Sequence, residues 1–280
     1  MSFLCSRYGV SRSGFYAWQR RPNSRRIEED RVLGEHIARV HRDSHGSYGS
    51  PRVQRSLERE GLCVSEKRVA RLMRAAGLAG RASRVYRRLP GLHRFYEKIP
   101  NLRLAQPPPD GIDQVWVGDL TYIRVAGAWR YLAVVMDLYS RRLIGWAVSR
   151  TKSLAVTTRA LQRAVAVRHP PPGLMFHSDR GVEYVAYAYQ SLLKTHGITA
   201  SLSRPYTCQD NAHMESFFHS LKAELLHRRD IHSDGQLNAM LAGYIERFYN
   251  SRRLHSSLGY YSPVEFEELM CSKQSVHKIG

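Results

Sequence analysis

The stretch VWVGDLTYIRV at residues 115–125 decides the fold of the larger part of this chain. Its β-branched and aromatic residues, with partial alternation of apolar and polar positions, favour a strand. The Ala126-Gly127 pair that follows predicts a tight turn, and WRYLAVVMDLYS (129–140) and RRLIGWAVS (141–149) are typical of two further strands. Because the connections are so short, these three strands are expected to form an antiparallel meander.

The segments after this meander alternate between helical and strand-like patterns. We expect helices over residues 153–168, 184–197 (YVAYAYQSLLKTHG) and 210–226 (DNAHMESFFHSLKAELL), and strands at 174–179 (LMFHSD) and 198–203 (ITASLS). The run YLAVVM is nearly all apolar, as expected for a strand buried on both faces. The order βββαβαβα predicts an α/β fold with a mixed five-stranded sheet and flanking helices.

Residues 1–82 predict a separate, small all-α region. The segment VQRSLEREG ends at Gly61, and Ser65 is placed to cap a helix in SEKRVARLMRAAG. Two short helices joined in this way resemble a helix-turn-helix. Its second helix would present basic side chains to DNA, namely Lys67, Arg68, Arg71 and Arg74. A helical bundle with a solvated basic face is the alternative.

The charge balance points to a polyanionic partner. The chain has 43 Lys and Arg residues against 24 Asp and Glu, a net charge of +19. Most of the cations are arginine, whose planar fork matches phosphate. Nucleic acid is therefore the leading partner. Ribosome-type RNA binding or an acidic protein partner would give the same balance.

Residues 83–112 are expected to form a linker. RASRVYRRLPGLHRFYEK (81–98) is basic with interspersed aromatic residues, and AQPPPDG (105–111) is a stiff proline spacer. We expect this segment to touch the DNA backbone, with a merely solvated linker as the alternative. The third region, residues 113–272, would be the core with a C-terminal helical extension.

Cysteine usage and hydropathy exclude several classes of protein. The four cysteines form no CxxC pair, so a disulfide framework or a structural zinc site is not expected. No run approaches the ~20 apolar residues that a membrane span needs. The start of the chain lacks the pattern of a secretion signal. A cytoplasmic protein without a membrane partner is expected.

Three acids stand where the surrounding sequence favours other residues. Asp119 lies inside the first predicted strand, where Asp is depleted, and Asp179 follows the fourth strand in HSDRGVEY. Glu215 lies beside apolar residues of the helix at 210–226. Burial of each carboxylate alone would be unfavourable, and three converging carboxylates would repel one another unless cations compensate.

The chemistry of these acids favours magnesium or manganese. Carboxylate oxygens are hard ligands, which Mg²⁺ and Mn²⁺ prefer. Two such ions about 4 Å apart can stabilise the attacking and leaving oxygens of an in-line phosphodiester displacement. Asp119 would bridge the ions, and Asp179 and Glu215 would each complete the shell of one ion.

Five ordered motifs resemble a known family. They are WVGDLTYI, VVMDLYSRRLIGWAVS, HSDRGVEY, DNAHMESFFHSLKAE and YIERFYNSRRLHSSLGYYSP. Together they are similar to the retroviral-integrase-like core of DDE transposases, specifically the second-frame (OrfB-type) proteins of bacterial insertion sequences. YGSPRVQRSLEREG is similar to the helix-turn-helix segment of the same proteins. The resemblance covers nearly the whole chain, and 35 residues separate Asp179 from Glu215, the spacing associated with this family.

The resemblance implies a ribonuclease H-like fold, with Asp119, Asp179 and Glu215 as the catalytic triad. It implies a transposase that cleaves DNA at the ends of its element and exposes a 3′-hydroxyl. That hydroxyl then attacks another phosphodiester, in DNA integration and recombination, and no protein nucleophile is required. Two departures from the family pattern stand out: SRPYTCQDN replaces a glycine- and lysine-containing loop, and Glu183 replaces a commoner glutamine.

Several neighbouring residues have two interpretations each. Lys222, two helical turns after Glu215, is expected to meet DNA, with a merely solvated lysine as the alternative. Arg253 and His255 would either position phosphate or stabilise a turn. His177 would contact phosphate or hold the active-site loop, and Asn211 would cap the late helix or bond near the metal ions. Asp137 is expected to cap a turn, with a metal ligand as the alternative.

The partners expected are double-stranded DNA, both the element's inverted-repeat ends and its target, and further copies of the chain on that DNA. An upstream-frame product, separate or fused, is also expected. The alternative function is that of an inactive or truncated copy that occupies the element ends and represses transposition. A ribonuclease H that cuts RNA–DNA hybrids shares the fold, but the helix-turn-helix argues against it.

Overall fold

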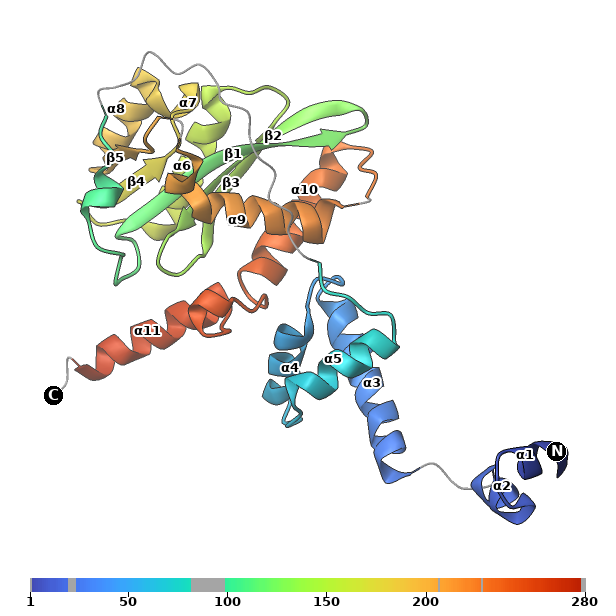
Figure 1. The fold of residues 1–280 in the computed structure, drawn as a ribbon. Helices are drawn as coiled ribbons and strands as arrows, with labels where there is room; N and C mark the ends of the chain where they lie inside the picture. Colours follow the sequence, from blue (N-terminus) through green and yellow to red (C-terminus); the bar gives the residue numbers. More distant parts are fainter. Residues whose placement is uncertain (1, 20–23, 82–98, 206, 228, 278–280) are drawn as a thin grey trace. The chain divides into compact units, whose positions relative to one another are not determined.

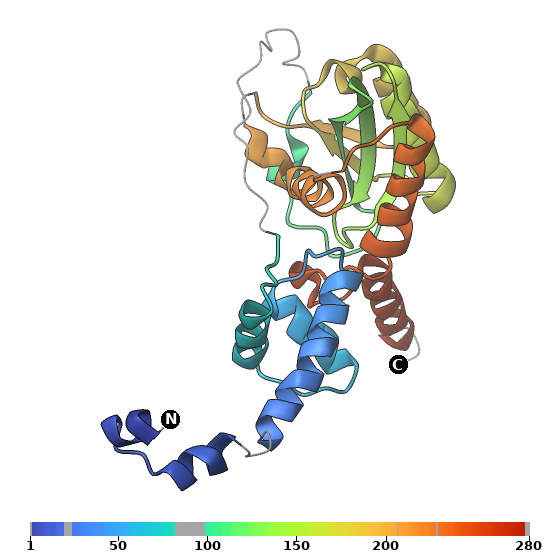
Figure 2. The same ribbon diagram turned by 90° about the vertical axis from the view of Figure 1, so that its right-hand side faces the viewer.

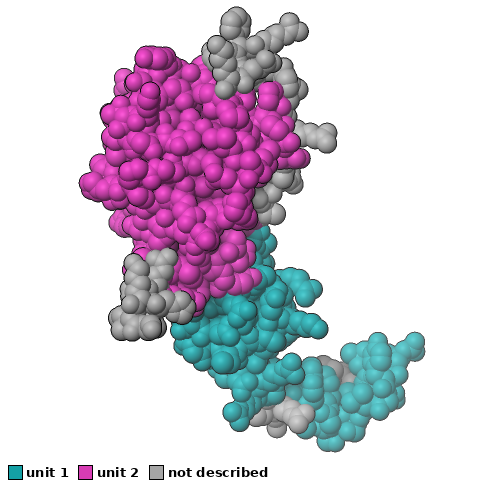
Figure 3. All heavy atoms as spheres, turned by 90° about the vertical axis from the view of Figure 1, so that its left-hand side faces the viewer, with its two compact units in different colours: residues 1–80 teal, residues 81–280 magenta. Residues whose placement is uncertain are grey.

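The computed structural model describes residues 2–19, 24–81, 99–205, 207–227 and 229–277. The chain divides into two compact units, residues 1–80 and residues 81–280 (Figure 3). Within the described residues, no helix combines the length and apolar character needed to cross a membrane.

The first unit consists of helices, as expected. They are α1 (Ser2–Arg7), α2 (Arg12–Gln19), α3 (Arg25–Asp43), α4 (Ser50–Arg59) and α5 (Glu66–Ala75). The Ser65 hydroxyl accepts a hydrogen bond from the Arg68 amide at 3.3 Å and caps α5, as predicted. Gly61 has a φ of +82°, a conformation that suits glycine and ends the turn after α4.

The core of the first unit lies between its three longer helices. Buried aliphatic side chains of α3, α4 and α5 form it: Ile37, Val40, Val53, Leu57, Val69 and Met73. They recur at three- and four-residue spacing, so each helix turns one apolar stripe inward. Helices α4 and α5 form the helix-turn-helix pair that the sequence predicts.

The second unit is built on a five-stranded sheet in the order β3-β2-β1-β4-β5 (Figure 1). The strands are β1 (Val115–Val125), β2 (Ala128–Asp137), β3 (Leu143–Ser149), β4 (Met175–Ser178) and β5 (Thr199–Leu202). The first three pair antiparallel, and β4 pairs parallel with both β1 and β5. The mixed sheet and the antiparallel meander are therefore confirmed.

The turn between β1 and β2 has the backbone that a two-residue hairpin needs. Ala126 and Gly127 have φ values of +46° and +81°. Positive φ at both central positions matches the twist of the flanking strands, and the turn is where the sequence predicted it.

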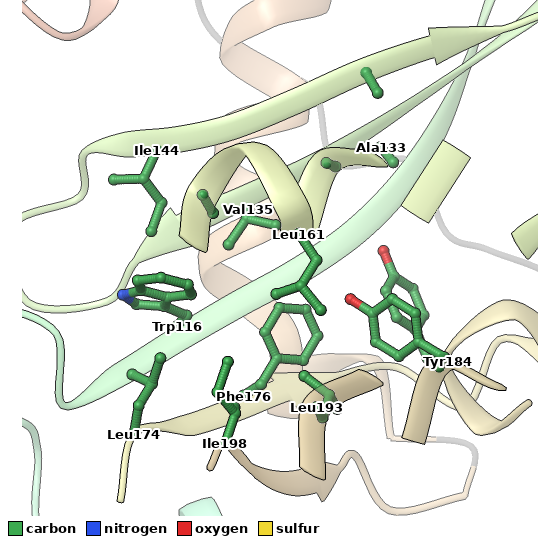
Figure 4. Packing of buried hydrophobic residues seen from close by; sticks show 14 of the residues in the cluster. Trp116, Ala133, Val135, Ile144, Leu161, Leu174, Phe176, Tyr184, Leu193 and Ile198 are labelled. Atoms are coloured by element: carbon green, nitrogen blue, oxygen red, sulfur yellow. The ribbon is translucent and has the colours of Figure 1, made fainter. Parts of the chain in front are cut away.

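One face of the sheet carries the main apolar core. Trp116, Leu161, Phe176 and Leu193 lie together there (Figure 4). A side chain on Gly118 would collide with Phe176, because an added Cβ would lie 2.4 Å from its ring. Glycine at position 118 therefore allows β4 to supply a large ring beside β1.

The helices of the second unit cover both faces of the sheet. They are α6 (Leu154–Arg168), α7 (Val182–Val185), α8 (Tyr187–Thr195), α9 (Ala212–Leu221), α10 (Asp234–Ala242) and α11 (Pro263–His277). Helix α6 packs on β2 and β3, while α9 contacts β1. Figures 1 and 2 show α6 and α9 on opposite sides of the sheet.

Two predicted helices differ in detail from the structure. The helix expected at 184–197 is two helices, because Ala186 is extended (φ −57°, ψ 136°) between α7 and α8. The helix expected at 210–226 begins with a 3₁₀ turn (Cys208–Asn211) and ends in a π-helical segment (Lys222–Leu226).

Only part of the expected linker is described, since residues 82–98 lie outside the described residues. Residues 99–105, with a 3₁₀ turn at Leu102–Ala105, run along the edge of the sheet. The Leu202 amide donates to the Pro100 carbonyl at 3.2 Å, and Arg180 Nη2 donates to the Ile99 carbonyl at 2.9 Å. This segment is therefore tied to β5 and to the loop after β4.

Candidate functional site

The parallel pairing of β1 and β4 sets Asp119 and Asp179 side by side. Val117 pairs with His177, and Gly118 pairs with Ser178. Asp119 is the next residue of β1, and Asp179 is the first residue after the end of β4. Residues in register on parallel strands leave the sheet at the same level and on the same face. Trp116 points into the α6 core, so Asp119, three residues later, points to the face that α9 covers.

The two carboxylates differ in exposure. Asp119 is only 5% exposed, whereas Asp179 is half-buried. Asp119 Oδ1 accepts the Leu120 amide at 2.7 Å, and Asp179 Oδ1 accepts the Gly181 amide at 3.0 Å. A carboxylate in the middle of a largely buried strand is unfavourable for folding alone, so its position calls for a ligand or a counter-charge.

Helix α9 brings the third acid toward the same strand. Asn211, the residue before α9, donates its side-chain amide to the Gly118 carbonyl at 3.2 Å. Glu215 lies four residues later, so it occupies the same side of the helix as Asn211. The half-buried Glu215 therefore lies on the side of α9 that is anchored to β1 next to Asp119.

A buried tyrosine reports how closely the acids gather. Burial raises the pKa of the Tyr184 hydroxyl well above its ordinary value, and the charges of Tyr189, Asp119, Asp179 and Glu183 raise it further. The Tyr184 ring lies close to two of these acids, because a Cβ added at Gly181 would meet Asp179 Oδ1 at 3.0 Å, Glu183 Oε2 at 3.2 Å and Tyr184 Cδ2 at 3.6 Å.

Glu183 adds a fourth acid beside Asp179. A side chain on Gly181 would meet both Asp179 Oδ1 at 3.0 Å and Glu183 Oε2 at 3.2 Å. Glu183 is only 5% exposed, and Lys152 Nζ lies 3.5 Å from its Oε1. Lys152 offsets part of the added negative charge. Sequence reasoning missed Lys152, because nothing in its local sequence marks it as a partner of an acid 31 residues away.

The oxygen donors of Asp119, Asp179, Glu215 and Asn211 suit a hard divalent cation, although the carboxylates do not stand in a complete metal-binding arrangement. Among the described residues, no three His, Cys, Asp or Glu side chains stand in positions that could hold a metal ion. The Asn211 Oδ1 atom is buried without a hydrogen-bond partner. A buried acceptor without a donor calls for a water or an ion. Oxygen donors of this kind fit Mg²⁺ or Mn²⁺.

His177 is held inside the sheet. Its Nδ1 lies 2.9 Å from Ser201 Oγ and its Nε2 lies 3.1 Å from Ser203 Oγ. Burial lowers the pKa of His177 to about 4, so the ring is neutral at neutral pH. Both ring nitrogens bind residues at or beside β5, and this geometry fits the interpretation that His177 holds the active-site loop.

Asp137 caps a turn, as expected. It is fully buried at the end of β2 and accepts hydrogen bonds from the Asp113 and Ser140 amides, each at 2.8 Å. Burial raises the pKa of Asp137 above its ordinary value. The prediction of a structural role is confirmed by these contacts.

Arg253 lies in a buried ion pair. Its Nη2 lies 2.7 Å from Glu224 Oε1 and its guanidinium carbon lies 5.6 Å from the centre of the Tyr249 ring. The Tyr244 hydroxyl donates to the same Glu224 at 2.7 Å. Burial alone would lower the pKa of Arg253, but Glu224 raises it above its ordinary value. At 5% side-chain exposure, this guanidinium is placed to join helical segments rather than to meet phosphate.

His255 packs beside the same group. Its ring lies 4.8 Å from the Tyr249 ring, edge to face, and the residue is 7% exposed. Lys222, by contrast, is exposed, and its Nζ lies 5.1 Å from the centre of the Tyr122 ring. Of the basic residues singled out in this unit, Lys222 is the exposed one, on the continuation of the helix that carries Glu215.

The four basic residues of α5 fall into two pairs. Arg68 Nε and Arg71 Nη2 both bind Asp30 of α3, at 2.7 and 2.5 Å. The paired guanidiniums lower the pKa of Asp30, with the Arg71 hydrogen bond contributing most. Lys67 and Arg74 are exposed on α5, and Arg74 Nε donates to the Ala70 carbonyl within the helix.

Comparison with known families follows the two units. Residues 110–208 and 196–263 match two models described as integrase core domains, and residues 28–86 match an HTH-like domain. Transposase InsF of insertion sequence IS3A from Escherichia coli (strain K12) is 37% identical over 268 residues, which cover 94% of this chain and 92% of that protein. The transposase of insertion sequence IS904 from Lactococcus lactis subsp. lactis (strain IL1403) is 34% identical over 249 residues, or 89% of this chain and 98% of that protein.

Among solved structures, the chain is similar to the catalytic core domain of HTLV-2 integrase in complex with magnesium. The TM-score is 0.43 and the identity is 16%, over 55% of this chain and 96% of that one.

Proposed function

This chain belongs to the integrase-core transposases of bacterial insertion sequences, and we propose that Asp119, Asp179 and Glu215 form its active site. The protein is a transposase that cleaves DNA at the ends of its insertion sequence and transfers the freed strand to new DNA. The observation that supports this site most strongly is the register of β1 and β4, which pairs Gly118 with Ser178, the residues that come directly before the two aspartates.

The three carboxylates would hold the divalent cations, two Mg²⁺ or Mn²⁺. When bound, such cations stabilise the charge on the attacking and leaving oxygens of a phosphodiester displacement. Asp119 would supply its carboxylate from the central strand, and Asp179 and Glu215 would supply theirs from the end of β4 and from α9.

The remaining residues of the site position these acids. Asn211 fixes the start of α9 to Gly118 and so sets the approach of Glu215 to β1. Lys152 offsets the charge of Glu183 beside Asp179. The buried ring of Tyr184 packs beside the Asp179–Glu183 segment and helps to fix its position. The attacking oxygen comes from water or from the DNA 3′-hydroxyl.

DNA recognition is assigned to the first unit. Lys67 and Arg74 of α5 would face DNA directly, while Arg68 and Arg71 hold α5 against α3 through Asp30. Cleavage at two ends of an element requires two active sites, so several copies of the chain would act on paired ends. The upstream-frame product, separate or fused, would join that assembly. The protein would work at the cytoplasmic nucleoid.

The test is a cleavage and strand-transfer assay with DNA that carries the element ends, with Mg²⁺ and then Mn²⁺. Asp119→Asn should abolish cleavage and joining while leaving binding of the DNA ends intact. Asp110→Asn is the matched control, because Asp110 is exposed and its contact with Gln114 is one that an amide can also make. Full activity in Asp119→Asn would refute the active site. End binding by the unmodified protein without nicking in either metal would favour a repressor instead.

A further inference from the structure

The hairpin formed by β1 and β2 carries two large exposed rings. Tyr122 lies opposite Tyr131, and Arg124 lies opposite Trp129, in the register of the two strands. Partners across an antiparallel pair, and residues two apart on a strand, share a face. Tyr122, Arg124 and Trp129 are therefore on one face. Tyr122 is 56% exposed and Trp129 is 49% exposed.

Two cations lie against these rings. Lys222 Nζ lies 5.1 Å from the centre of the Tyr122 ring, and Arg124 Cζ lies 5.8 Å from the centre of the Trp129 ring. The two rings contact each other edge to face, with their centres 5.0 Å apart and their planes at 84°. We call these four residues the hairpin platform. Its charged members are both cationic, so it attracts an anionic partner.

The hairpin is fixed to the rest of the unit near its tip. The Ala126 amide at the turn donates to the Ile231 carbonyl at 2.8 Å. Arg130 of β2 binds Asp234 at the start of α10, and Arg150 binds the same carboxylate at 2.8 Å. These bonds hold the exposed rings in place before any partner arrives. A preorganised surface loses less entropy on binding.

The hairpin platform is attached to two elements of the proposed active site. Tyr122 follows Asp119 by three residues of β1, roughly 10 Å along the strand, and its side chain leaves the strand on the other face. Lys222 follows Glu215 by seven residues, or about two helical turns and roughly 10 Å. The platform therefore lies roughly 10 Å from the acids along each element, and Lys222, through its contact with Tyr122, links it to the helix that carries Glu215.

We propose that the hairpin platform stacks an unpaired DNA base next to the strand that is cut. An exposed aromatic ring offers a face on which any base can stack, provided that the base has left its duplex. Lys222 and Arg124 would meet the phosphates on either side of that base. This inference rests on the proposed function. In a transposase, the platform would hold the end of the cut strand apart from its complement.

The test uses the full chain and a decathymidine with one central 2-aminopurine, without divalent metal. Fluorescence of 2-aminopurine falls when it stacks, so quenching reports the platform directly. Tyr122→Leu and Trp129→Leu should each weaken binding about tenfold and abolish quenching. Tyr122→Phe, which keeps the ring, should behave as the unmodified protein. Trp18→Leu is the control, because Trp18 is an exposed ring (71%) on α2.

A 20-base-pair blunt duplex serves as the second probe. The leucine variants should bind it with unchanged affinity and should keep the unmodified melting temperature. Unaltered quenching in both leucine variants would overturn the proposal, and so would an equal loss of affinity for duplex and single strand. Because the measurement needs no cleavage, it can be repeated in the Asp119→Asn background. Quenching in that variant would support the platform whether or not Asp119 is catalytic, whereas cleavage by the unmodified protein without any quenching would contradict the platform and leave the proposed function standing.

Discussion

The side-chain amide of Asn211 donates to the carbonyl oxygen of Gly118, and this 3.2 Å bond joins the start of α9 to β1 one residue before Asp119. Two elements that are 93 residues apart in sequence are thereby fixed at the point where their acids must meet. The bond involves a backbone oxygen, so it sets the position of the helix without depending on the charge of either acid.

Loss of the Asn211 side chain should therefore reduce catalysis more than stability. Asn211→Ala removes one hydrogen bond, which contributes about 1 kcal/mol to folding. Misplacement of Glu215 should slow strand transfer by about 10- to 100-fold. Thermal melting and a joining assay measure the two effects. Asn238→Ala is the control, because Asn238 makes a comparable side-chain bond within α10. An unchanged rate of strand transfer in Asn211→Ala would show that this hydrogen bond does not position Glu215.

Duplex binding should depend on the two exposed cations of α5. Lys67→Ala and Arg74→Ala should each weaken binding of end DNA and reduce the slope of log affinity against log salt by about one. Arg25→Ala is the control, since the Arg25 side chain is 94% exposed on α3. Electrophoretic mobility shifts at several salt concentrations give the slope. An equal loss of affinity in the Arg25 variant would show that α5 does not make a specific contact with the DNA.

Arg253 should matter for folding. Arg253→Met leaves Glu224 buried without its cation, which should lower the free energy of unfolding by about 3–5 kcal/mol. The double variant Arg253→Met, Glu224→Leu should regain much of that loss, because neither charge then remains buried. Urea unfolding measures both. A variant that keeps full stability but loses DNA affinity would instead place Arg253 at the DNA.

Acid sensitivity should come partly from Glu267. Burial alone would raise its pKa, but hydrogen bonds from Arg168 and Ser140 outweigh burial and lower it below 4.5. A carboxylate with a lowered pKa stabilises the fold above its unfolded pKa and loses that contribution as the pH falls through its folded pKa.

Glu267→Gln should therefore reduce stability at pH 7 and flatten the decline of the melting temperature below pH 4.5. Glu268→Gln is the control. Glu268 is the exposed neighbour of Glu267, so its replacement should leave the dependence of the melting temperature on pH unchanged. If the melting temperature of Glu267→Gln fell with pH in parallel with that of the unmodified protein, Glu267 would not be a source of the acid sensitivity.

The sequence predicts the sheet well where local signals are strong. β1 spans the predicted residues 115–125, and the Ala126-Gly127 turn lies where expected. Helix α7 ends before the predicted helix does because Ala186 adopts an extended backbone. No residue type in that segment predicts this break. The sequence predicted which strands pair antiparallel. The register of β1 and β4 was not predictable, because it depends on packing such as that of Phe176 against Gly118.

Long-range charge pairing was beyond prediction. The partner of Arg68 and Arg71 is Asp30, about 40 residues earlier, and the partner of Arg253 is Glu224, 29 residues earlier. A basic residue on a helix looks the same in sequence whether it faces DNA or an acid of its own chain. The choice depends on how helices pack, which periodicity alone does not fix.

The most direct test of the active site is a calorimetric titration of Mn²⁺ into the full chain bound to uncut end DNA. The unmodified protein and Asp110→Asn should take up Mn²⁺ with the same affinity. Asp119→Asn, Asp179→Asn and Glu215→Gln should each lose that uptake by tenfold or more, because the three carboxylates hold the cations together. Uptake that is unchanged in any one of these three variants would contradict the shared site.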